Sequence, residues 1–220
     1  MQKPIECVLF DLDGTLLDTS YDFAYALKKT CKAFNRPVVD YSTIRNTVSQ
    51  GGLAVTQLAF ADLTGDALEE KRQFFLEVYF NHIALHTDLF PGLHSGLEYL
   101  AENEIPWGIV TNKPTWLTKK LLESFVFPSE PHTVICGDTL KVRKPDPEPM
   151  LLAAKQCGVD PEHCLYLGDH PRDIEAGKNA NMQTGSAFFG YLPKTASASD
   201  WNADYDFHTP YEISEFIQTL

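Results

Sequence analysis

The stretch Cys7-Val8-Leu9-Phe10-Asp11-Leu12-Asp13-Gly14-Thr15-Leu16 runs from an apolar segment directly into two carboxylates. An apolar run of this length that ends at a turn signal is typical of a buried strand in a parallel sheet. Asp11 and Asp13 would then follow its carboxyl end, the edge at which open α/β sheets bind ligands. Acids at this place need positive charge beside them, which a divalent cation with oxygen ligands would supply. The alternative from these residues alone is a solvated turn in which Asp13 caps a helix.

The length and composition bound the class of protein. With 220 residues, 44% of them apolar, the chain can form one domain or a core domain with a small insert. The net charge of −12 argues against unspecific binding to nucleic acid or to an anionic membrane. No signal-peptide pattern and no bilayer-length apolar run is visible, so we expect a cytoplasmic protein. The five cysteines show no CxxC pairing, which favours reduced thiols over a disulfide framework or a zinc site.

The pattern of apolar residues changes twice along the chain. Residues 18–86 have helical periodicity throughout, with helices expected over 21–34, 41–48, 53–62 and 66–85. After this block, strands alternate with helices. The strands are expected at 107–110, 133–136, 164–167 and 184–188, and the helices at 94–103, 117–124, 144–157, 172–179 and 211–219. A Ser- and Ala-rich loop is expected near 196–200.

Alternation of strands and helices indicates an α/β fold with a Rossmann-like, doubly wound parallel sheet. The all-helical block interrupts this alternation and therefore predicts an inserted α-helical cap domain. We place the cap domain at residues 18–86 and the core domain at residues 1–17 and 87–220.

Polar side chains follow the expected strands at or soon after the point where each strand ends. They are Asp11 and Asp13, then Thr111, Asn112 and Lys113, then Lys144, and finally Asp169 and Asp173. Because the carboxyl ends of parallel strands share one edge of a sheet, we expect these side chains to converge. Carboxylates with one lysine and one hydroxyl suit metal-assisted phosphoryl transfer, in which the enzyme mainly positions groups and stabilises charge.

Each of these residues also has a purely structural role open to it. Lys144 could be a solvated lysine before a helix, and Thr111 could cap a strand end. Asp169 could be an N-cap, and Asp173 a first-turn acid that complements a helix dipole. The joint order and spacing of the residues favour the catalytic interpretation.

Four motifs of this chain resemble, in order and spacing, those of the haloacid dehalogenase-like phosphatases. They are Asp11-Leu12-Asp13-Gly14-Thr15, Thr111, Lys144-Pro145 and Gly168-Asp169-His170-Pro171-Arg172-Asp173. The resemblance covers essentially the whole chain, and the helical insert is similar to the small α-helical cap of that superfamily. It implies a phosphomonoesterase that works through an aspartyl-phosphate.

The resemblance also implies roles for the matching residues. Asp11 would be the nucleophile that attacks phosphorus, and the Asp13 side chain would protonate the leaving alkoxide and later deprotonate water. Thr111 would donate its hydroxyl to a phosphoryl oxygen, helped by the backbone N–H of Asn112. Lys144 would neutralise developing charge and hold Asp11 in place.

The implied cofactor is Mg²⁺, which offsets the repulsion between a carboxylate and a phosphate dianion. Its expected ligands are Asp11, the backbone carbonyl of Asp13, and Asp169, with Asp173 in the outer shell or bound through water. His170 is expected to line the mouth of the site, because the oxygen ligands already suffice.

The cap offers one candidate for reading the leaving group of the substrate. Arg45 is the sole cation between Pro37 and Glu70, and Gly51 and Gly52 follow it closely. Arginine suits capture of a carboxylate, and glycines let backbone N–H groups approach a ligand; a solvated helix arginine is the alternative. The aromatic stripe that includes Phe74, Phe75 and Tyr79 is expected to pack the cap rather than to bind a sugar.

Within the family, the chain looks closest to the phosphoglycolate phosphatase-like group. The segments 90–92, 107–114, 189–191 and 201–204 resemble most closely the members that act on N-acetylmuramic acid 6-phosphate. That ester is therefore the expected substrate ahead of 2-phosphoglycolate.

The lack of a cap lysine between residues 37 and 70 disfavours a phosphonoacetaldehyde hydrolase, and Asp13 disfavours a dehalogenase. A phosphomutase or a non-catalytic phosphate-binding protein remains an alternative. We expect a small-molecule phosphate ester as partner and a monomer or homodimer.

Overall fold

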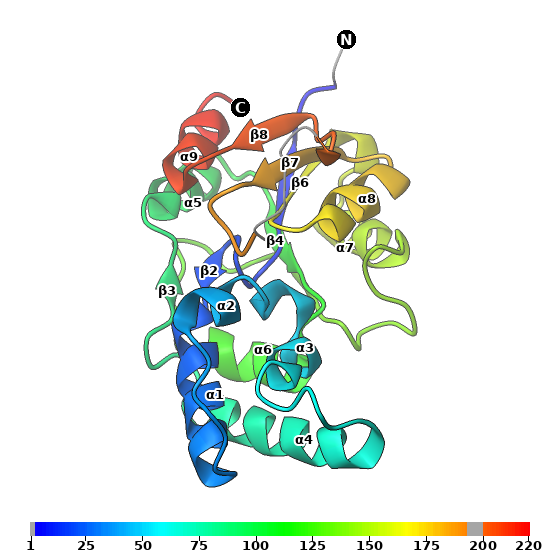
Figure 1. Cartoon of the computed structure of the whole chain (residues 1–220). Coiled ribbons are helices and arrows are strands. Elements are labelled where there is room, and N and C mark those ends of the chain that lie inside the picture. Colours follow the sequence, from blue (N-terminus) through cyan, green and yellow to red (C-terminus); the bar gives the residue numbers. More distant parts are fainter. Residues whose placement is uncertain (1–2, 193–199) are drawn as a thin grey trace.

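A computed structural model describes residues 3–192 and 200–220, so all but the last residue of the Ser- and Ala-rich loop predicted at 196–200 lies outside the described residues. A six-stranded sheet lies in the upper half of the molecule as drawn in Figure 1, and its strands all pair in parallel. In spatial order the strands are β5 (Thr133–Ile135), β4 (Trp107–Val110), β1 (Cys7–Phe10), β6 (Cys164–Gly168), β7 (Gln183–Ala187) and β8 (Tyr205–Phe207). The predicted strands are therefore present, and they form the predicted parallel sheet.

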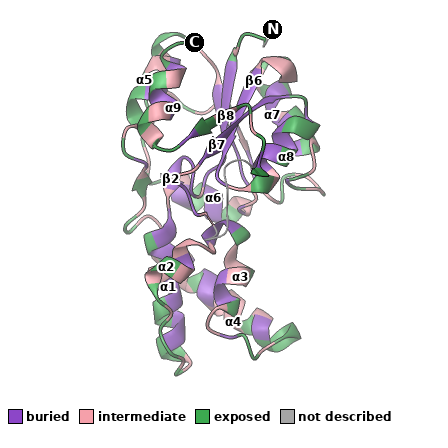
Figure 2. Ribbon diagram, turned by 45° about the horizontal axis from the view of Figure 1, so that its top comes forward, coloured by how far each residue is buried: buried purple, intermediate pink, exposed green. Residues whose placement is uncertain are grey.

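Strand β1 lies inside the sheet between β4 and β6, and all four of its residues are buried. Because side chains alternate along a strand, Val8 and Phe10 face one side while Cys7 and Leu9 face the other. The first side is covered by α5 (Leu93–Glu102) and α9 (Pro210–Ile217), and the second by α7 (Glu148–Cys157) and α8 (Pro171–Asn179). Figure 2 shows the buried strands between these two helical layers, which confirms the doubly wound α/β class.

Helices of the segment between β2 (Leu17–Asp18) and β3 (Asp88–Leu89) lie together beyond one end of the sheet (Figure 1). They are α1 (Ser20–Ala33), α2 (Tyr41–Arg45), the short 3₁₀ helix η1 (Val48–Gln50), α3 (Gly52–Gln57) and α4 (Gly65–Asn81). Strands β2 and β3 pair antiparallel at the base of this segment, where the chain leaves the sheet region and returns to it. The division into a cap domain at 18–86 and a core domain stays a prediction.

Three helices of this segment are shorter than expected, and one of them, predicted over 66–85, is α4, which ends at Asn81. The helix predicted over 41–48 ends at Arg45 and is followed by η1, which ends just before Gly51, where a φ of +89° turns the chain. The helix predicted over 53–62 ends at Gln57, after which the backbone bonds tighten to the i→i−3 type. The tighter turn brings Phe60, which is 1% exposed, into the interior.

The remaining helix, α6 (Thr115–Leu122), begins directly after the loop that follows β4. Leu117 and Leu121 of this helix pack in the same core cluster as Phe23, Phe75 and Tyr79 of the helical segment. The aromatic stripe of the helical segment therefore contributes to a continuous core, as expected for Phe75 and Tyr79. Among the described residues, none of the helices has the length and apolar character that crossing a membrane requires.

Candidate active site

Three carboxylates from two adjacent strand ends meet at one edge of the sheet. Asp11 follows β1, and Asp169 and Asp173 follow β6, the neighbouring strand. One oxygen of each carboxylate lies within 4.8 Å of the others, and all three side chains are buried. The convergence of these predicted residues follows from the parallel pairing of β1 with β6.

Lys144 provides the positive charge inside this cluster. Its Nζ lies 2.9 Å from Asp11 Oδ1 and 2.7 Å from Asp173 Oδ1. The ammonium also donates to the carbonyl of Val110 at 2.9 Å and to the hydroxyl of Tyr166 at 2.6 Å. With 3% of its surface exposed, Lys144 is not the solvated lysine of the structural alternative.

The charges of the cluster do not balance without a further cation. If all three carboxylates were ionised, they and the one ammonium would leave a net charge of −2 in a buried place. Burial raises the pKa of Asp11 to about 6, although Lys144 acts in the opposite direction. Burial and the neighbouring Asp11 raise the pKa of Asp169 to about 8. Asp169 Oδ1 is also buried without a hydrogen-bond donor among the described residues. The cluster therefore fits a divalent cation that prefers oxygen ligands.

Asp169 is fixed from both sides by close contacts. Its Oδ2 accepts from the backbone N–H of Tyr191 at 2.7 Å and from the hydroxyl of Ser49 in η1 at 2.8 Å. A Cβ at Gly14 would lie 2.1 Å from this oxygen, and one at Gly190 would lie 2.3 Å from Asp169 Cβ. The two glycines therefore leave room for the carboxylate, and the helical segment contacts the carboxylate cluster directly through Ser49.

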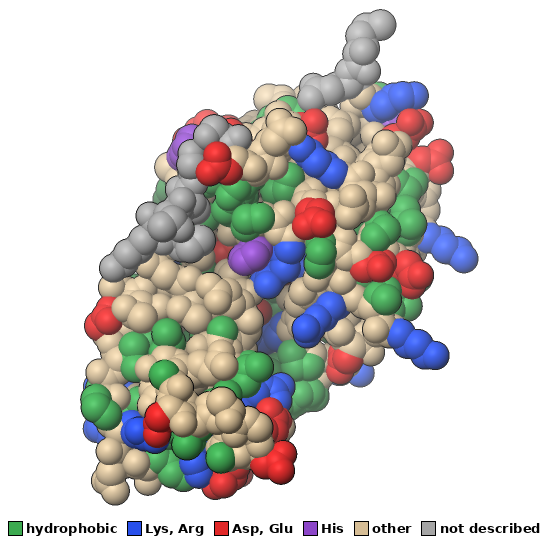
Figure 3. All heavy atoms as spheres, turned by 45° about the vertical axis from the view of Figure 1, so that its right-hand side comes forward, with side chains coloured by type: hydrophobic (Ala, Val, Ile, Leu, Met, Phe, Trp, Pro, Cys, Tyr) green, Lys and Arg blue, Asp and Glu red, His purple; other side chains and the backbone are tan. Residues whose placement is uncertain are grey.

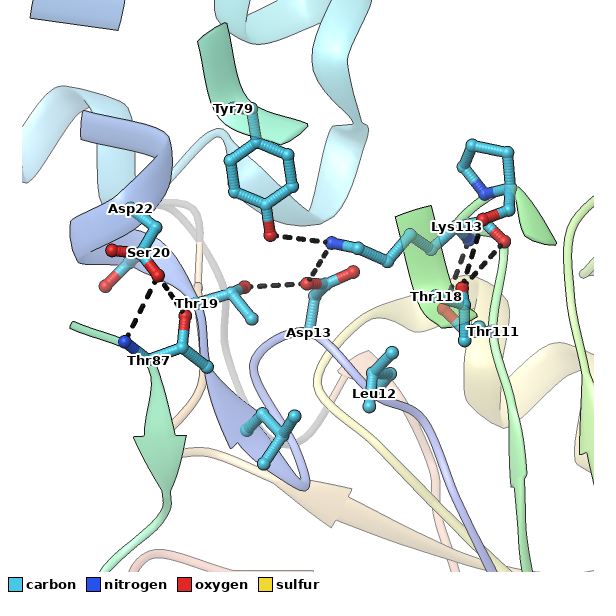
Figure 4. A network of polar contacts seen from close by, with 12 residues as sticks. Leu12, Asp13, Thr19, Ser20, Asp22, Tyr79, Thr87, Thr111, Lys113 and Thr118 are labelled. Atoms are coloured by element: carbon cyan, nitrogen blue, oxygen red, sulfur yellow. Dashed lines mark hydrogen bonds and ion pairs between the residues drawn. The ribbon is translucent and has the colours of Figure 1, made fainter. Parts of the chain in front are cut away.

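Asp13 lies beside this cluster but has partners of its own. Its Oδ1 accepts from the Lys113 ammonium at 2.8 Å and from the Thr19 hydroxyl at 2.7 Å (Figure 4). Lys113 also donates to the Tyr79 hydroxyl at 2.9 Å. The Asp13 side chain is thus separate from the three carboxylates that gather around the candidate metal position. A metal bond through the backbone carbonyl of Asp13 stays a prediction.

Thr111 and Asn112 lie at the end of β4, beside the loop that carries Lys144. The Thr111 hydroxyl oxygen accepts from the backbone N–H of Lys113 at 3.1 Å, so its own proton remains available to a ligand. The Asn112 side chain donates to the carbonyl of Lys144 at 3.0 Å and thereby joins the two loops. Their predicted contacts with a phosphoryl group stay predictions.

The predicted cap residues lie close to the same edge of the sheet. Arg45 donates to the carbonyls of Gly190 at 2.7 Å and Phe189 at 2.9 Å, and it lies over the Tyr191 ring at 5.1 Å. Position 51 favours glycine because of its positive φ. Steric contact is not the reason, because no atom lies within 4 Å of a Cβ built there. The roles of Arg45, Gly51 and Gly52 toward a substrate stay predictions.

His170 is the N-cap of helix α8. Its Nδ1 accepts from the backbone N–H of Arg172 at 3.2 Å, while Asp173 Oδ2 accepts from the His170 N–H at 3.1 Å. Burial, followed by the charge of Arg172, lowers the pKa of His170 to about 4. The reciprocal capping box shows that Asp173 also stabilises the helix start, the structural role considered for it.

The surface around the site has a favourable charge for an anionic ligand. Figure 3 shows Lys, Arg and His side chains gathered in the hollow between the sheet and the helical segment. An anionic ester would therefore meet positive charge there, although the chain as a whole carries a net charge of −12.

Three contacts at the site go beyond what the sequence patterns predict. Lys113 was expected at this strand end with Thr111 and Asn112, but its bond to Asp13 was not predicted. Ser49 begins the predicted stretch that ends in Gly51-Gly52, but its contact with Asp169 spans 120 positions. Tyr191 reaches Asp169 through its backbone N–H, which no side-chain pattern predicts.

Comparison with known proteins gives the family. Residues 8–187 match the model of the haloacid dehalogenase-like hydrolases. An N-acetylmuramic acid 6-phosphate phosphatase of Pseudomonas putida is 36% identical over 98% of this chain and 97% of its own. A phosphoglycolate phosphatase of Xanthomonas campestris is 36% identical over 94% of both chains. The crystal structure of a predicted phosphoglycolate phosphatase from Haemophilus somnus superposes with a TM-score of 0.87 at 23% identity, covering 99% of this chain and 100% of that one. The chain therefore belongs to the haloacid dehalogenase-like hydrolases, as a phosphatase of that family.

Proposed function

We propose that this protein is a Mg²⁺-dependent phosphomonoesterase that hydrolyses a small carboxylated phosphate ester, with N-acetylmuramic acid 6-phosphate as the first candidate. The observation that carries the proposal is the buried Asp11, held by Lys144 at 2.9 Å beside Asp169 and Asp173. This arrangement presents a carboxylate nucleophile next to a place for a divalent cation.

The residues divide the chemistry into two steps. In the first, an Asp11 oxygen forms a bond to phosphorus while the ester P–O bond breaks, and the leaving oxygen takes its electron pair and a proton from Asp13. In the second, Asp13 removes a proton from water, whose oxygen bonds to phosphorus while the bond to Asp11 breaks. Thr111 and the Asn112 N–H hold the phosphoryl oxygens throughout.

The three buried carboxylates are the candidate ligands of the metal. Asp11 and Asp169, with Asp173 directly or through water, would hold Mg²⁺. When bound, Mg²⁺ offsets the repulsion between Asp11 and the phosphate dianion. Lys144 contacts both Asp11 and Asp173, so it keeps the nucleophile oriented toward the same place.

The substrate is proposed from the relatives and from the charge of the hollow. Two relatives at 36% identity carry different names, one for N-acetylmuramic acid 6-phosphate and one for phosphoglycolate. Both esters carry a carboxylate, so the proposed carboxylate-binding role of Arg45 serves either of them. We place the former first because the relative named for it matches 98% of this chain and because the strand-end and tail segments resemble that group.

A phosphate-release assay tests the proposal. Purified protein is incubated with N-acetylmuramic acid 6-phosphate, 2-phosphoglycolate and a panel of sugar phosphates, with and without Mg²⁺. We expect release of phosphate from the first ester, dependent on Mg²⁺, and its loss in Asp11→Asn. Turnover of another ester instead would refute the substrate and keep the chemistry. Isomerised sugar phosphate as the main product would indicate a mutase, and folded protein without any turnover would indicate a phosphate-binding protein.

A further inference from the structure

Lys113 is a buried charge that the proposed chemistry does not use. Among the lysines of the described residues, only Lys113 and Lys144 are buried, and Lys144 already has its place beside Asp11. The Lys113 side chain is 3% exposed. Burying an ammonium is costly unless it is paired and hydrogen-bonded. The position of Lys113 is therefore set by the groups that surround it.

Those groups are one carboxylate and two aromatic side chains, one of which is a phenol. Lys113 Nζ lies 2.8 Å from Asp13 Oδ1 and 2.9 Å from the Tyr79 hydroxyl. It also lies 5.0 Å from the centre of the Phe23 ring and 4.7 Å from that of Tyr79, within cation–π range. The ammonium is thus held against Asp13 by residues of two helices, α1 and α4.

The two hydrogen bonds to Asp13 share one oxygen. Lys113 and Thr19 both donate to Oδ1, and Figure 4 shows them approaching it from opposite sides. No hydrogen bond to Asp13 Oδ2 is formed within the described part of the chain. When one oxygen of a carboxylate accepts two hydrogen bonds, the orientation of the group is fixed. The second oxygen is then left to carry a proton.

Tyr79 connects this arrangement to the helical segment. Burial raises the pKa of Tyr79 well above its usual value, so the side chain stays a neutral phenol whose oxygen accepts from Lys113. Since Tyr79 belongs to α4, a residue from beyond the sheet supports the Lys113 ammonium. The loop after β4 and the helical segment therefore meet at the carboxyl group assigned to proton transfer.

We propose that Lys113 is a positioning residue that holds Asp13 Oδ1 so that Oδ2 exchanges the proton with the ester oxygen and with water, and that Tyr79 anchors Lys113. This inference rests on the proposed phosphomonoesterase chemistry. Among the described residues, Lys113 forms its ion pair with Asp13, whereas Asp11 and Asp173 form theirs with Lys144.

The test uses the dependence of the reaction on its leaving group. An alkyl ester such as N-acetylmuramic acid 6-phosphate or 2-phosphoglycolate needs a proton from Asp13 as its P–O bond breaks, whereas p-nitrophenyl phosphate loses a stable phenolate. Lys113→Met removes the ammonium and keeps the length of the side chain. We expect kcat/KM to fall about 30-fold or more for the alkyl ester and only about threefold for p-nitrophenyl phosphate.

A double-mutant cycle shows whether Lys113 acts through Asp13. Asp13→Asn should show the same selective loss, in larger measure. Adding Lys113→Met to Asp13→Asn should change kcat/KM for the alkyl ester by less than about twofold, because the group that Lys113 positions is already absent. Lys119→Met, an exposed lysine of α6, is the matched control and should match the wild type.

Tyr79→Phe tests the anchor and also covers the case that Lys113→Met does not fold. It keeps the ring contacts and removes only the hydroxyl, so it should show a loss of about three- to fivefold, again selective for the alkyl ester. Equal losses on both esters, or independent effects of Lys113→Met and Asp13→Asn in the cycle, would overturn the inference while the phosphatase stands. A wild-type protein without turnover of either ester would instead overturn the proposed function.

Discussion

The backbone N–H of Tyr191 donates to Asp169 Oδ2 at 2.7 Å. The hydroxyl of the same tyrosine contacts the linker between β2 and α1, residues 18–20, where the helical segment begins. That hydroxyl donates to Asp18 Oδ1 at 2.8 Å and accepts from the backbone N–H of Ser20 at 3.0 Å. One residue therefore ties a candidate metal ligand to the place where the helical segment begins.

Tyr191→Phe separates these two contacts. The substitution keeps the N–H and removes the hydroxyl, which leaves the Ser20 N–H with only a long bond to Asp18. We expect the free energy of unfolding to fall by about 1–2 kcal/mol. Urea denaturation measures this change, and Tyr211→Phe, at a 57% exposed tyrosine, is the control. A stability equal to that of the wild type would show that the hydroxyl does not hold the linker.

Lys144→Met should destabilise the protein strongly. It leaves two buried carboxylates without their ammonium, a change that costs about 3–5 kcal/mol. The pKa of Asp11 is already raised in the folded protein, so the folded state binds more protons than the unfolded state as the pH falls toward 6. Lys144 lowers the pKa of Asp11, so its removal raises that pKa further and widens the pH range in which protonation favours the folded state. The variant should therefore melt at a higher temperature near pH 5 than near pH 8 in the absence of Mg²⁺, and the opposite order would contradict the buried pairing.

Stabilisation by Mg²⁺ should depend on pH. The pKa of Asp11 is about 6 and that of Asp169 about 8, so both carboxyls hold protons in part at neutral pH without a cation. Because a cation binds their ionised forms, its binding releases protons and weakens as the pH falls. We expect the rise in Tm on adding Mg²⁺ to be larger at pH 8.5 than at pH 6. Calorimetry in buffers of different ionisation enthalpy counts the released protons, and their absence would argue against Asp169 as a ligand.

Gly14→Ala and Gly158→Ala form a matched pair of substitutions. Both glycines have a positive φ, +92° and +72°, so both variants carry the backbone strain of about 1 kcal/mol. A Cβ at Gly14 would also lie 2.1 Å from Asp169 Oδ2, whereas nothing lies within 4 Å of one at Gly158. Gly14→Ala should therefore lose Mg²⁺ binding and phosphate release, and Gly158→Ala should keep both. Equal behaviour of the two variants would show that the close approach to Asp169 is unimportant.

The main strands and their terminal carboxylates could be predicted because each has a local pattern. β1 and β6 are short apolar runs that end in acids, and parallel pairing then brings Asp11 and Asp169 together. Strand β8 was not predicted, because Tyr205-Asp206-Phe207 is a three-residue alternation at the sheet edge among polar residues. The β2–β3 pair was not predicted either, since each strand has two residues and the partners lie about 70 positions apart.

The contacts between the helical segment and the sheet were also beyond prediction. The bond from Lys113 to Tyr79 spans 34 positions, and its geometry depends on how α4 packs against the loop after β4. Periodicity places Tyr79 on the buried side of its helix, and it cannot tell that the phenol oxygen meets an ammonium there. Charges buried in pairs of this kind follow from the tertiary fold.

The antiparallel β2–β3 pair has a consequence for how this protein can diversify. Leu17 pairs with Leu89 and Asp18 with Asp88, so everything between them occupies the position of a hairpin turn. An insert whose two ends are hydrogen-bonded neighbours places no demand on the strands of the central sheet. The segment can therefore change in length without moving β1 or β6, whereas Ser49 and Tyr79 restrict its composition through their contacts with Asp169 and Lys113.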